Sequence, residues 1–435
     1  MKVLIETFGC RANQYDSERV RSLVLSSGCE VVDTAEEADV AIFNSCAVTS
    51  DAEADLRQKV RRRARENPQL HSVIMGCASG LEIDQRGRAS ADGVSLMTLP
   101  TVDSLIGGAD FDTVAKALGV SNGARPGTQR GARGLLRIQD GCDERCTFCA
   151  TTIARGANRS RGVAELVEEA AEIARTRNEI VLTGAHIGSY GGDIGTVLSA
   201  LVETLIARVP SVRFRLSSLE ATEVDARLIE IFREDPRRLV PYLHAPLQSG
   251  SNSVLKRMGR HWYDAYSYAA AIERILDGHA WFGLGADVIA GFPGETKGDH
   301  GETVALVESL PFTSLHVFPY SARPGTAAPR LRANVHSAEV TRRARELRAI
   351  AAERADAYAR RRAGSIADVV VIRSAAKESA KPGEGLTEDY LTVQIIDEAV
   401  ARGSRFDATL MAGDAGLVAH PTPSPRTPSE AFNFQ

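Results

Sequence analysis

Short apolar runs alternate with helical patterns along the first 330 residues, and this alternation constrains the fold more than any other feature. Within residues 1–120, the candidate strands lie at 3–5, 39–43 and 73–75, and the candidate helices at 15–26 and 50–66. Asp16 and Ser50 are placed to cap these two helices. Because strands that alternate with helices form parallel sheets, residues 1–120 are predicted to fold as a flavodoxin- or Rossmann-like α/β layer.

The alternation resumes on a larger scale in residues 135–362. Candidate strands lie at 135–139, 179–183, 212–217, 241–244, 284–290 and 314–318. Candidate helices lie at 162–177, 195–208, 224–234, 264–277 and 298–310, and a long helix follows at 337–362. This order predicts a partial (βα)6 barrel, whose active site would lie at the carboxyl ends of its strands.

The remaining segments differ in composition from the two α/β regions. A Gly/Pro/Arg-rich linker is predicted at 121–134, a small antiparallel β-barrel at 366–420 and a disordered tail at 421–435. The chain has neither an apolar run of about 18 residues nor a signal peptide, so we expect a cytoplasmic protein that makes no membrane contact.

All seven cysteines precede residue 150, and three of them form the motif Cys142-x3-Cys146-x2-Cys149 directly after a predicted strand. Clustered thiols in a reducing compartment are more often metal ligands than disulfides. Zinc sites usually combine four ligands, and no fourth Cys or His lies nearby. Three thiolates instead suit a [4Fe–4S] cluster with one open iron, although a structural zinc loop or incidental thiols remain alternatives.

A second set of cysteines is dispersed in the sequence. Cys10, Cys46 and Cys77 each follow a predicted strand of the N-terminal sheet, so right-handed crossovers place all three at one edge. There they can hold a second cluster with an open position, unless they are ordinary buried thiols. Cys29 precedes a strand and is expected at the opposite edge, without a ligand role.

The motif at 142–149, with Phe148 before its last cysteine, resembles the radical S-adenosylmethionine (SAM) enzymes. Two cysteine sets in one chain narrow the resemblance to the methylthiotransferases over residues 1–362, and the last barrel resembles their TRAM domain. The resemblance rests on six sequence segments: FGCRANQYDSE at 8–18, LRIQDGCDERCTFC at 136–149, VLTGAHIGSYG at 181–191, LHAPLQSGSNSVLKRMGR at 243–260, DVIAGFPGET at 287–296 and HVFPYSARPGT at 316–326.

The resemblance implies two [4Fe–4S] clusters, SAM and an electron donor such as flavodoxin or ferredoxin. Cys10, Cys46 and Cys77 would hold an auxiliary cluster, and Cys142, Cys146 and Cys149 the radical-generating one. It also implies SAM contacts at strand ends, although each such residue could be an ordinary turn position: Phe148, Thr183, Gly184, Ser218, Gln248 and Val288. The clusters and SAM carry the chemistry, so no catalytic side chain is nominated.

The segment Gly9-Cys10-Arg11-Ala12-Asn13-Gln14 resembles the corresponding segment in the branch of the family that acts on N6-threonylcarbamoyladenosine at position 37, in the anticodon stem-loop of tRNA. Arg11 and Gln14 could meet that polar base. Three alternatives stay open: another tRNA adenosine such as isopentenyladenosine, a ribosomal-protein aspartate, or a zinc- or cluster-bearing RNA-binding protein without catalysis.

Charge gives the RNA hypothesis mixed support. Residues 56–65 hold six basic residues and no acidic one, and 341–362 hold eight Arg against three acidic residues, although both can be solvated helix faces. From residue 365 onward, 6 basic and 10 acidic residues give a net charge of −4. The TRAM-like module therefore binds RNA weakly unless its cations share one face: Arg373, Lys377, Lys381, Arg402 and Arg405. The segment after Cys149 lacks the proline that the family often has there, but the spacing from Cys149 to Arg155 is unchanged.

Overall fold

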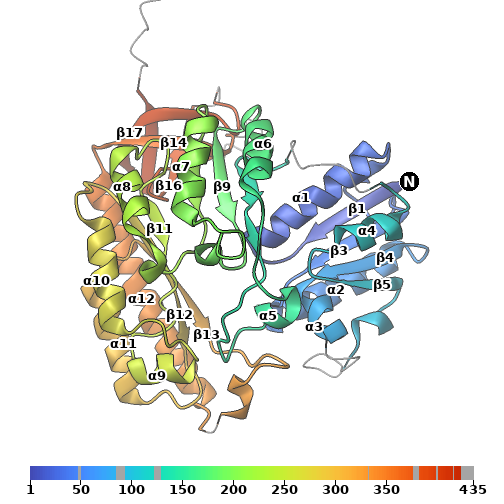
Figure 1. The fold of residues 1–435 in the computed structure, drawn as a ribbon, viewed down its shortest axis with the longest axis horizontal. Helices are drawn as coiled ribbons and strands as arrows, with labels where there is room; N and C mark the ends of the chain where they lie inside the picture. The colour runs from blue at the N-terminus through green and yellow to red at the C-terminus, as the bar shows by residue number, and fades with distance from the viewer. Residues whose placement is uncertain are drawn as a thin grey trace, which may run out of the picture.

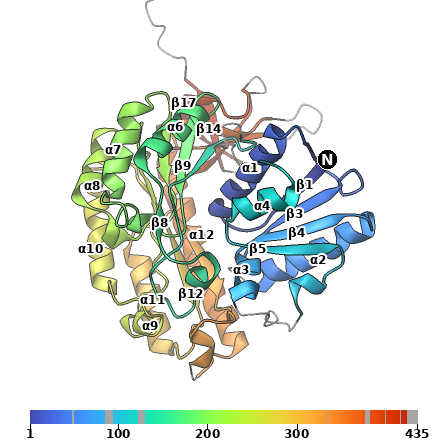
Figure 2. The same cartoon turned by 45° about the vertical axis from the view of Figure 1, so that its right-hand side comes forward.

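The computed structural model describes residues 1–47, 50–84, 94–121, 129–331, 333–375, 382–397, 400–414 and 416–422. An N-terminal α/β body lies beside a larger α/β body, and a small β-barrel packs on one end of the larger one (Figure 1). Turning the molecule keeps this arrangement (Figure 2). The helix α5 lies at the junction of the two α/β bodies, beside α3 (Figure 1). Among the described helices, none has both the length and the apolar character needed to cross a bilayer.

The N-terminal body is built on a five-stranded sheet of order β2-β1-β3-β4-β5, and every pair in it is parallel. This is the doubly wound order of flavodoxin-like folds, as predicted. The strands are β1 (Lys2–Thr7), β2 (Glu30–Val32), β3 (Val40–Ser45), β4 (His71–Gly76) and β5 (Val102–Gly107). The helices are α1 (Arg11–Ser26), α2 (Ser50–Glu66), α3 (Cys77–Asp84) and α4 (Phe111–Leu118), with a 3₁₀ turn η1 (Leu96–Thr98).

Two apolar layers cover the sheet. One packs α1 and α4 against strand residues such as Val3 and Ile42, and the other packs α2 and α3 against neighbours such as Leu4 and Phe43. Because successive strand residues point to opposite faces, both layers come from the same continuous apolar runs.

The predicted cap at Asp16 is wrong. The helix α1 begins at Arg11, with Cys10 in extended N-cap geometry, so Asp16 lies inside the helix and is fully buried. It pairs with Arg137 and Arg155 of the larger body instead. The helix α2 does begin at Ser50, but the side chain of Ser50 lies outside the described part of the structure.

The larger body is an open barrel of six parallel strands, as the alternation predicted. Two three-stranded sheets, β10-β9-β6 and β11-β12-β13, are joined by parallel bridges at Phe214–Leu239 and Ser218–His244. The strands are β6 (Gly134–Arg137), β9 (Glu179–Thr183), β10 (Arg213–Leu216), β11 (Tyr242–His244), β12 (Gly283–Ala290) and β13 (Ser314–Pro319).

Helices cover the outside of this barrel, and a short excursion lies between its first two strands. The covering helices are α6 (Val163–Ala174), α7 (Leu198–Arg208), α8 (Ala226–Glu234), α9 (Asn252–Arg257), α10 (Ala265–Leu276), α11 (Lys297–Ser309) and α12 (Ser337–Arg362). The excursion contains β7 (Gln139–Asp140), α5 (Thr151–Arg155) and β8 (Arg159–Ser160); the 3₁₀ turns are η2 (Ile187–Ser189), η3 (Ala221–Glu223) and η4 (Ala328–Arg330).

The C-terminal barrel is closed in the order β14-β15-β16-β18-β17. Its strands are β14 (Ile366–Arg373), β15 (Gly383–Leu386), β16 (Thr392–Ile395), β17 (Arg405–Gly413) and β18 (Gly416–Pro421). The prediction that it is antiparallel is wrong at one pair, because β16 and β18 run parallel. Five strands in a closed ring cannot all alternate in direction, so one parallel pair is required. Of the predicted tail, residues 423–435 lie outside the described structure.

Candidate functional site

The N-terminal cysteines gather at one edge of the first sheet. Cys10 follows β1 and precedes α1, Cys46 lies directly after β3, and Cys77 opens α3 directly after β4. The strand order reverses between β1 and β3, and ligands of open α/β sheets bind at such switch points. Cys29 lies before β2, at the strand start as expected, among apolar residues under α1.

Asn13 is the side chain that ties these strand ends together. Its amide donates to the carbonyl oxygens of Phe8 (3.0 Å) and Ser45 (2.7 Å), which follow β1 and end β3. The Oδ1 atom of the same amide lies 3.7 Å from Cys10 Sγ and 4.0 Å from Cys77 Sγ. One fully buried amide therefore sets the distance between two of the three thiols.

The three thiols also interact through charge. Burial raises the pKa of Cys77 to about 11, Arg155 opposes the rise, and negative charge on Cys10 and Cys46 adds to it. Cys46 is buried against Gly9, where an added Cβ would lie 2.6 Å from the Cys46 sulfur. The sulfurs therefore face a common space, and a positively charged group there would favour their thiolate forms.

The second cysteine set lies on the loop between β7 and α5. Cys142 N–H donates to the Gly156 carbonyl (3.0 Å), and Thr147 N–H donates to the Met258 carbonyl (2.8 Å), so both ends of the loop are fixed by backbone. Burial raises the pKa of Cys146 to about 12; Arg260 lowers it, and Cys149 and Cys142 raise it further. These three sulfurs also share one space.

Two polar side chains from the barrel reach this loop. Arg260 donates to Cys146 Sγ (3.6 Å) and pairs with Glu220, and Cys142 Sγ lies 3.7 Å from His186 Nδ1. Although burial lowers it, hydrogen bonds to Cys142 and Glu223 raise the pKa of His186 to about 10. Each cysteine set thus has a buried arginine that donates to one sulfur: Arg155 for Cys77 and Arg260 for Cys146.

The spacing of the sulfurs argues against a single zinc ion in either set. Two thiolates bound tetrahedrally to zinc at 2.3 Å lie about 3.8 Å apart. Across the described ranges, neither cysteine trio has all its sulfurs within 4.8 Å of one another. Three thiols that share a space but stay farther apart fit the separate corners of a four-iron cube, so the donor sets fit [4Fe–4S] clusters.

Two cavities adjoin the cysteine sets. One, of about 130 Å³, is lined by Cys77, Cys149, Phe148 and Arg323, so it touches one thiol of each set. The other, of about 180 Å³, is lined by Gln248, Asp287 and Ile289, and it shares Phe148 and Arg323 with the first. The cavity beside the barrel strands and the cavity between the two cysteine sets therefore adjoin at Phe148 and Arg323.

The expected SAM contacts divide into three groups. Phe148 and Gln248 line the cavities, and Gln248 has a left-handed φ of 65° because its backbone bonds both Asp287 and Ile289. Thr183 is buried at the end of β9, and Gly184 follows it. A Cβ on Gly184 would lie 2.7 Å from the Gln139 side chain, so this turn has no room for a larger residue.

Ser218 and Val288 lie in different surroundings. Ser218 is exposed just after β10, beside His244. Val288 is fully buried in the apolar core, and its neighbours Asp287 and Ile289 face the cavity. A role of Val288 in binding would therefore pass through its backbone.

A polar cluster lies on neighbouring barrel strands and was not expected from the sequence. Asp287 bonds His244 (3.0 Å) and His316 (3.2 Å) through the same carboxylate oxygen. Although burial raises it, these two hydrogen bonds hold the pKa of Asp287 below its usual range. Asp287 also lines the larger of the two cavities, so the cluster adds a charged group to the wall of that cavity.

A third cavity, of about 400 Å³, lies between α1, residues 129–135 and the C-terminal barrel. Four arginines and one glutamate line it, together with Gln14: Arg21, Arg130, Arg133, Arg402 and Glu18. Burial, with the charge of Arg130, lowers the pKa of Arg21. Three of these arginines have acidic partners, Arg21 with Glu18, Arg130 with Asp33 and Arg133 with Glu179, whereas Arg402 donates to the Ile372 carbonyl. Such a cavity favours an anionic group.

The two basic stretches are only partly internal to the fold, because most of their cations are exposed: Arg61, Arg62 and Arg65 in α2, and Arg342, Arg345, Arg348, Arg360 and Arg361 in α12. In α2, Arg63 pairs with Glu6 and Glu66. In α12, Arg343 pairs with Glu295, and Arg362 is fully buried against Asp389.

The TRAM-like module offers few unpaired cations among its described residues. Arg373 pairs with Glu384 and Arg405 with Asp368, whereas Arg402 lines the third cavity. Lys377 and Lys381 lie outside the described residues. Acids next to them on the sheet neutralise both Arg373 and Arg405, so neither adds uncompensated positive charge for RNA.

Comparisons with known proteins agree with this geometry. Residues 2–93 match the family described as "Uncharacterized protein family UPF0004", and residues 136–307 match the radical SAM superfamily. A threonylcarbamoyladenosine tRNA methylthiotransferase, MtaB, from Bacillus subtilis is 33% identical over 417 residues, which cover 90% of this chain and 89% of that protein.

Two further proteins extend the comparison. A tRNA-2-methylthio-N(6)-dimethylallyladenosine synthase from Jannaschia sp. is 32% identical over 375 residues, covering 80% of this chain and 79% of that one. The solved radical SAM methyltransferase TsrM from Kitasatospora setae superposes with a TM-score of 0.53 over 73% of this chain and 72% of that chain, at 13% identity. That likeness concerns the fold alone.

Proposed function

The chain belongs to the radical SAM methylthiotransferases, and from this premise we propose that it adds a methylthio group to C2 of N6-threonylcarbamoyladenosine at position 37 of tRNA. The relative from Bacillus subtilis is named for this substrate and aligns along nine-tenths of the chain. Support from the chain itself comes from cations placed near the space between the cysteine sets.

The cofactors follow from the two donor sets. Cys142, Cys146 and Cys149 would hold the cluster that binds SAM, and Cys10, Cys46 and Cys77 the auxiliary cluster. When bound, the clusters and SAM supply the radical chemistry that replaces a C–H bond by a C–S bond, with an electron from a flavodoxin or ferredoxin. The protein keeps the two sites close through the cavity that Cys77 and Cys149 share.

The observation that carries the choice of substrate is the contact of Arg11 with Tyr390, which lies between β15 and β16 of the C-terminal barrel. Arg11, directly after Cys10, donates to Tyr390 Oη and lies 5.6 Å from the centre of that ring. A hydrogen bond to Asp287 raises the pKa of His316, while burial and the Arg11 charge lower it. Threonylcarbamoyladenosine carries a carboxylate that the Arg11 guanidinium can bind, whereas a dimethylallyl group offers only apolar surface.

An RNA substrate also needs contacts to phosphate. The arginine-lined cavity can accept one mainly at Arg402, because Arg21, Arg130 and Arg133 already pair with acids. The paired cations of the C-terminal barrel leave less charge for RNA on that module itself. We therefore place the main electrostatic contact at the junction between the bodies.

A second candidate keeps the reaction and changes the base. The Jannaschia relative, named for dimethylallyladenosine, is nearly as similar, so an isopentenyladenosine substrate is the alternative. Methylthiolation of a ribosomal-protein aspartate is a weaker alternative, because the relatives compared here are both named for tRNA.

Mass spectrometry of tRNA nucleosides from a deletion strain tests the proposal. We expect 2-methylthio-N6-threonylcarbamoyladenosine to disappear and its unmethylthiolated precursor to accumulate. The parent gene should restore the product, and Cys46→Ala, as a matched control, should not. Loss of the methylthio-isopentenyl nucleoside instead would support the alternative. Persistence of both products in a strain without a paralogue would contradict a tRNA substrate.

A further inference from the structure

The helix α5 directly follows the loop of the second cysteine set but packs in the N-terminal body. Ala150 and Ala154 lie in one apolar cluster with Ala78 and Leu81 of α3. The contact is close because α3 carries Gly80, where an added Cβ would lie 2.6 Å from the Ala154 carbonyl oxygen. The segment that follows Cys149 is therefore held against the helix that begins with Cys77.

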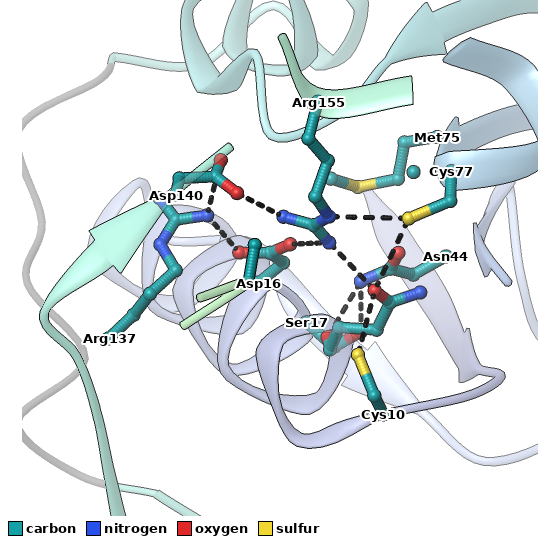
Figure 3. A network of polar contacts seen from close by, with 12 residues as sticks. Cys10, Asp16, Ser17, Asn44, Met75, Cys77, Arg137, Asp140 and Arg155 are labelled. Atoms are coloured by element: carbon teal, nitrogen blue, oxygen red, sulfur yellow. Dashed lines mark hydrogen bonds and ion pairs between the residues drawn. The ribbon is translucent and has the colours of Figure 1, made fainter. Parts of the chain in front are cut away.

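Arg155, the last residue of α5, uses this placement to reach the N-terminal thiols (Figure 3). Its Nε donates to Cys77 Sγ at 3.2 Å. One terminal nitrogen donates to Asn13 Oδ1 (2.7 Å), the amide that lies against the sulfurs of both Cys10 and Cys77. A single guanidinium thus contacts one thiol directly and two through Asn13.

The charge of Arg155 is held by two carboxylates on the side away from the sulfur. It donates to Asp16 (2.9 Å) and to Asp140 (2.9 Å), and both carboxylates also bind Arg137, at 2.6 and 3.4 Å. The charges of two arginines and two aspartates balance within this cluster. Arg155 lies at the edge of the cluster and faces Cys77 (Figure 3). Since Arg155 is 6% exposed, water screens this charge only weakly.

We propose that Arg155 is a positioning residue of the auxiliary site: it orients Cys77 and stabilises negative charge at the space shared by Cys10, Cys46 and Cys77. This inference rests on the proposed function, because it requires that the three thiols hold an iron–sulfur cluster. Hydrogen bonds to cluster sulfurs and nearby net charge are established determinants of cluster potentials. The radical SAM motif therefore controls a cofactor that it does not bind.

The sign of each substitution follows from this arrangement. Removing the cation with Arg155→Met destabilises the reduced, more negative state, so the midpoint potential of the auxiliary cluster should fall. Removing a compensating anion with Asp16→Asn leaves Arg155 less neutralised, so the potential should rise. A purely structural role gives no reason for opposite signs.

The test uses the full chain with Cys142, Cys146 and Cys149 replaced by Ala, so that iron can be held only by the N-terminal trio. After anaerobic reconstitution, iron content is measured and the midpoint potential is followed by electron paramagnetic resonance during a mediated reductive titration. Arg155→Met should lower the potential, Asp16→Asn should raise it, and Arg155→Lys, which keeps the charge, should stay nearer the parent than Arg155→Met.

Arg161→Met is the matched control. Arg161 crosses the same junction, donating to Tyr15 (3.1 Å) and Glu169 (2.6 Å), but the structure gives it no contact with a thiol. Its substitution should leave the potential unchanged. If Arg155→Met does not fold, Asp16→Asn and Arg155→Lys carry the test.

The proposed function and the role of Arg155 are contradicted by different results. A parent chain that binds no iron at the N-terminal trio would overturn the proposed function, and this inference with it. A cluster that assembles with the same potential in all variants, or shifts of one sign in Arg155→Met and Asp16→Asn, would overturn the inference alone.

Discussion

The two cysteine sets reach similar surroundings by different routes. Cys142, Cys146 and Cys149 lie on one short loop, so eight residues of local sequence place them together. Cys10, Cys46 and Cys77 are separated by 36 and 31 residues and meet only because β1, β3 and β4 are parallel neighbours. We call Cys142, Cys146 and Cys149 the loop set, because one loop places them together. We call Cys10, Cys46 and Cys77 the sheet set, because the order of the strands places them together.

This difference indicates which contacts each cysteine set needs to keep its geometry. The loop set depends on few contacts, such as the backbone bonds of Cys142 and Thr147. The sheet set depends on the whole N-terminal body, on Asn13 and on Arg155 from the other body. Damage to the junction should therefore harm the sheet set more than the loop set.

Single cysteine replacements should give the largest effects and separate the two sets. Cys146→Ala should abolish both 5′-deoxyadenosine production and methylthiolation, because SAM cleavage needs the loop set. Cys46→Ala should keep 5′-deoxyadenosine production but form no methylthio product. Both products are measured by mass spectrometry in single-turnover assays. Retained SAM cleavage in Cys146→Ala, or a methylthio product from Cys46→Ala, would reverse the assignment of the sets.

Widening the junction should come next in size. In Gly80→Leu, the new side chain overlaps the Ala154 carbonyl and pushes α5 from α3, which should lower the free energy of unfolding by about 1–3 kcal/mol. Methylthiolation should fall more than SAM cleavage. Gly107→Ala is the control, because its Cβ would meet neighbours only at 3.6 and 3.7 Å. Equal losses of both activities in Gly80→Leu would argue against a junction that mainly serves the sheet set.

Substrate preference should depend on the surroundings of the sheet set. Arg11→Gln, beside Cys10, removes a cation proposed to bind the substrate carboxylate, so kcat/KM for a threonylcarbamoyl-modified anticodon stem-loop should fall by about 10-fold or more. The isopentenyl-modified stem-loop should be affected less. Arg145→Gln, at an exposed position beside Cys146, is the counterpart and should change neither rate much. An equal loss on both stem-loops in Arg11→Gln would contradict the carboxylate contact.

The smallest effect is expected at Cys29. This thiol packs among apolar residues at the start of β2, away from both sets, so Cys29→Ala should change the free energy of unfolding by less than about 1 kcal/mol. Iron content should equal that of the parent. Loss of four irons in this variant would place Cys29 among the ligands and break the sheet argument.

Much of the fold could be predicted because its periodicity is local. The α12 helix begins and ends at the predicted residues, and the six barrel strands lie within one or two residues of their expected positions. The predicted helix cap at Asp16 was wrong, because a short polar residue before an apolar stripe has the same sequence pattern whether it caps a helix or binds arginines from another body. The parallel β16–β18 pair was missed because β15 and β18 carry weak strand patterns, so the odd strand count was not seen.

The candidate site divides in the same way. Spacing alone brought Cys142, Cys146 and Cys149 together, and strand order brought Cys10, Cys46 and Cys77 together. Asn13 and Arg260 could not be found, because an amide or a guanidinium that reaches a sulfur has no sequence pattern of its own. Arg155 was noticed only for its spacing from Cys149, and its partner Cys77 lies 78 residues away in another body.

Counting clusters in anaerobically reconstituted protein tests the central claim most directly, by Mössbauer spectroscopy together with iron and sulfide analysis. The parent should hold about eight irons in two [4Fe–4S] clusters, and about four should remain when either trio alone is replaced by alanine. One cluster in the parent, zinc in place of iron, or loss of all iron from both alanine variants would contradict two independent three-thiol sites.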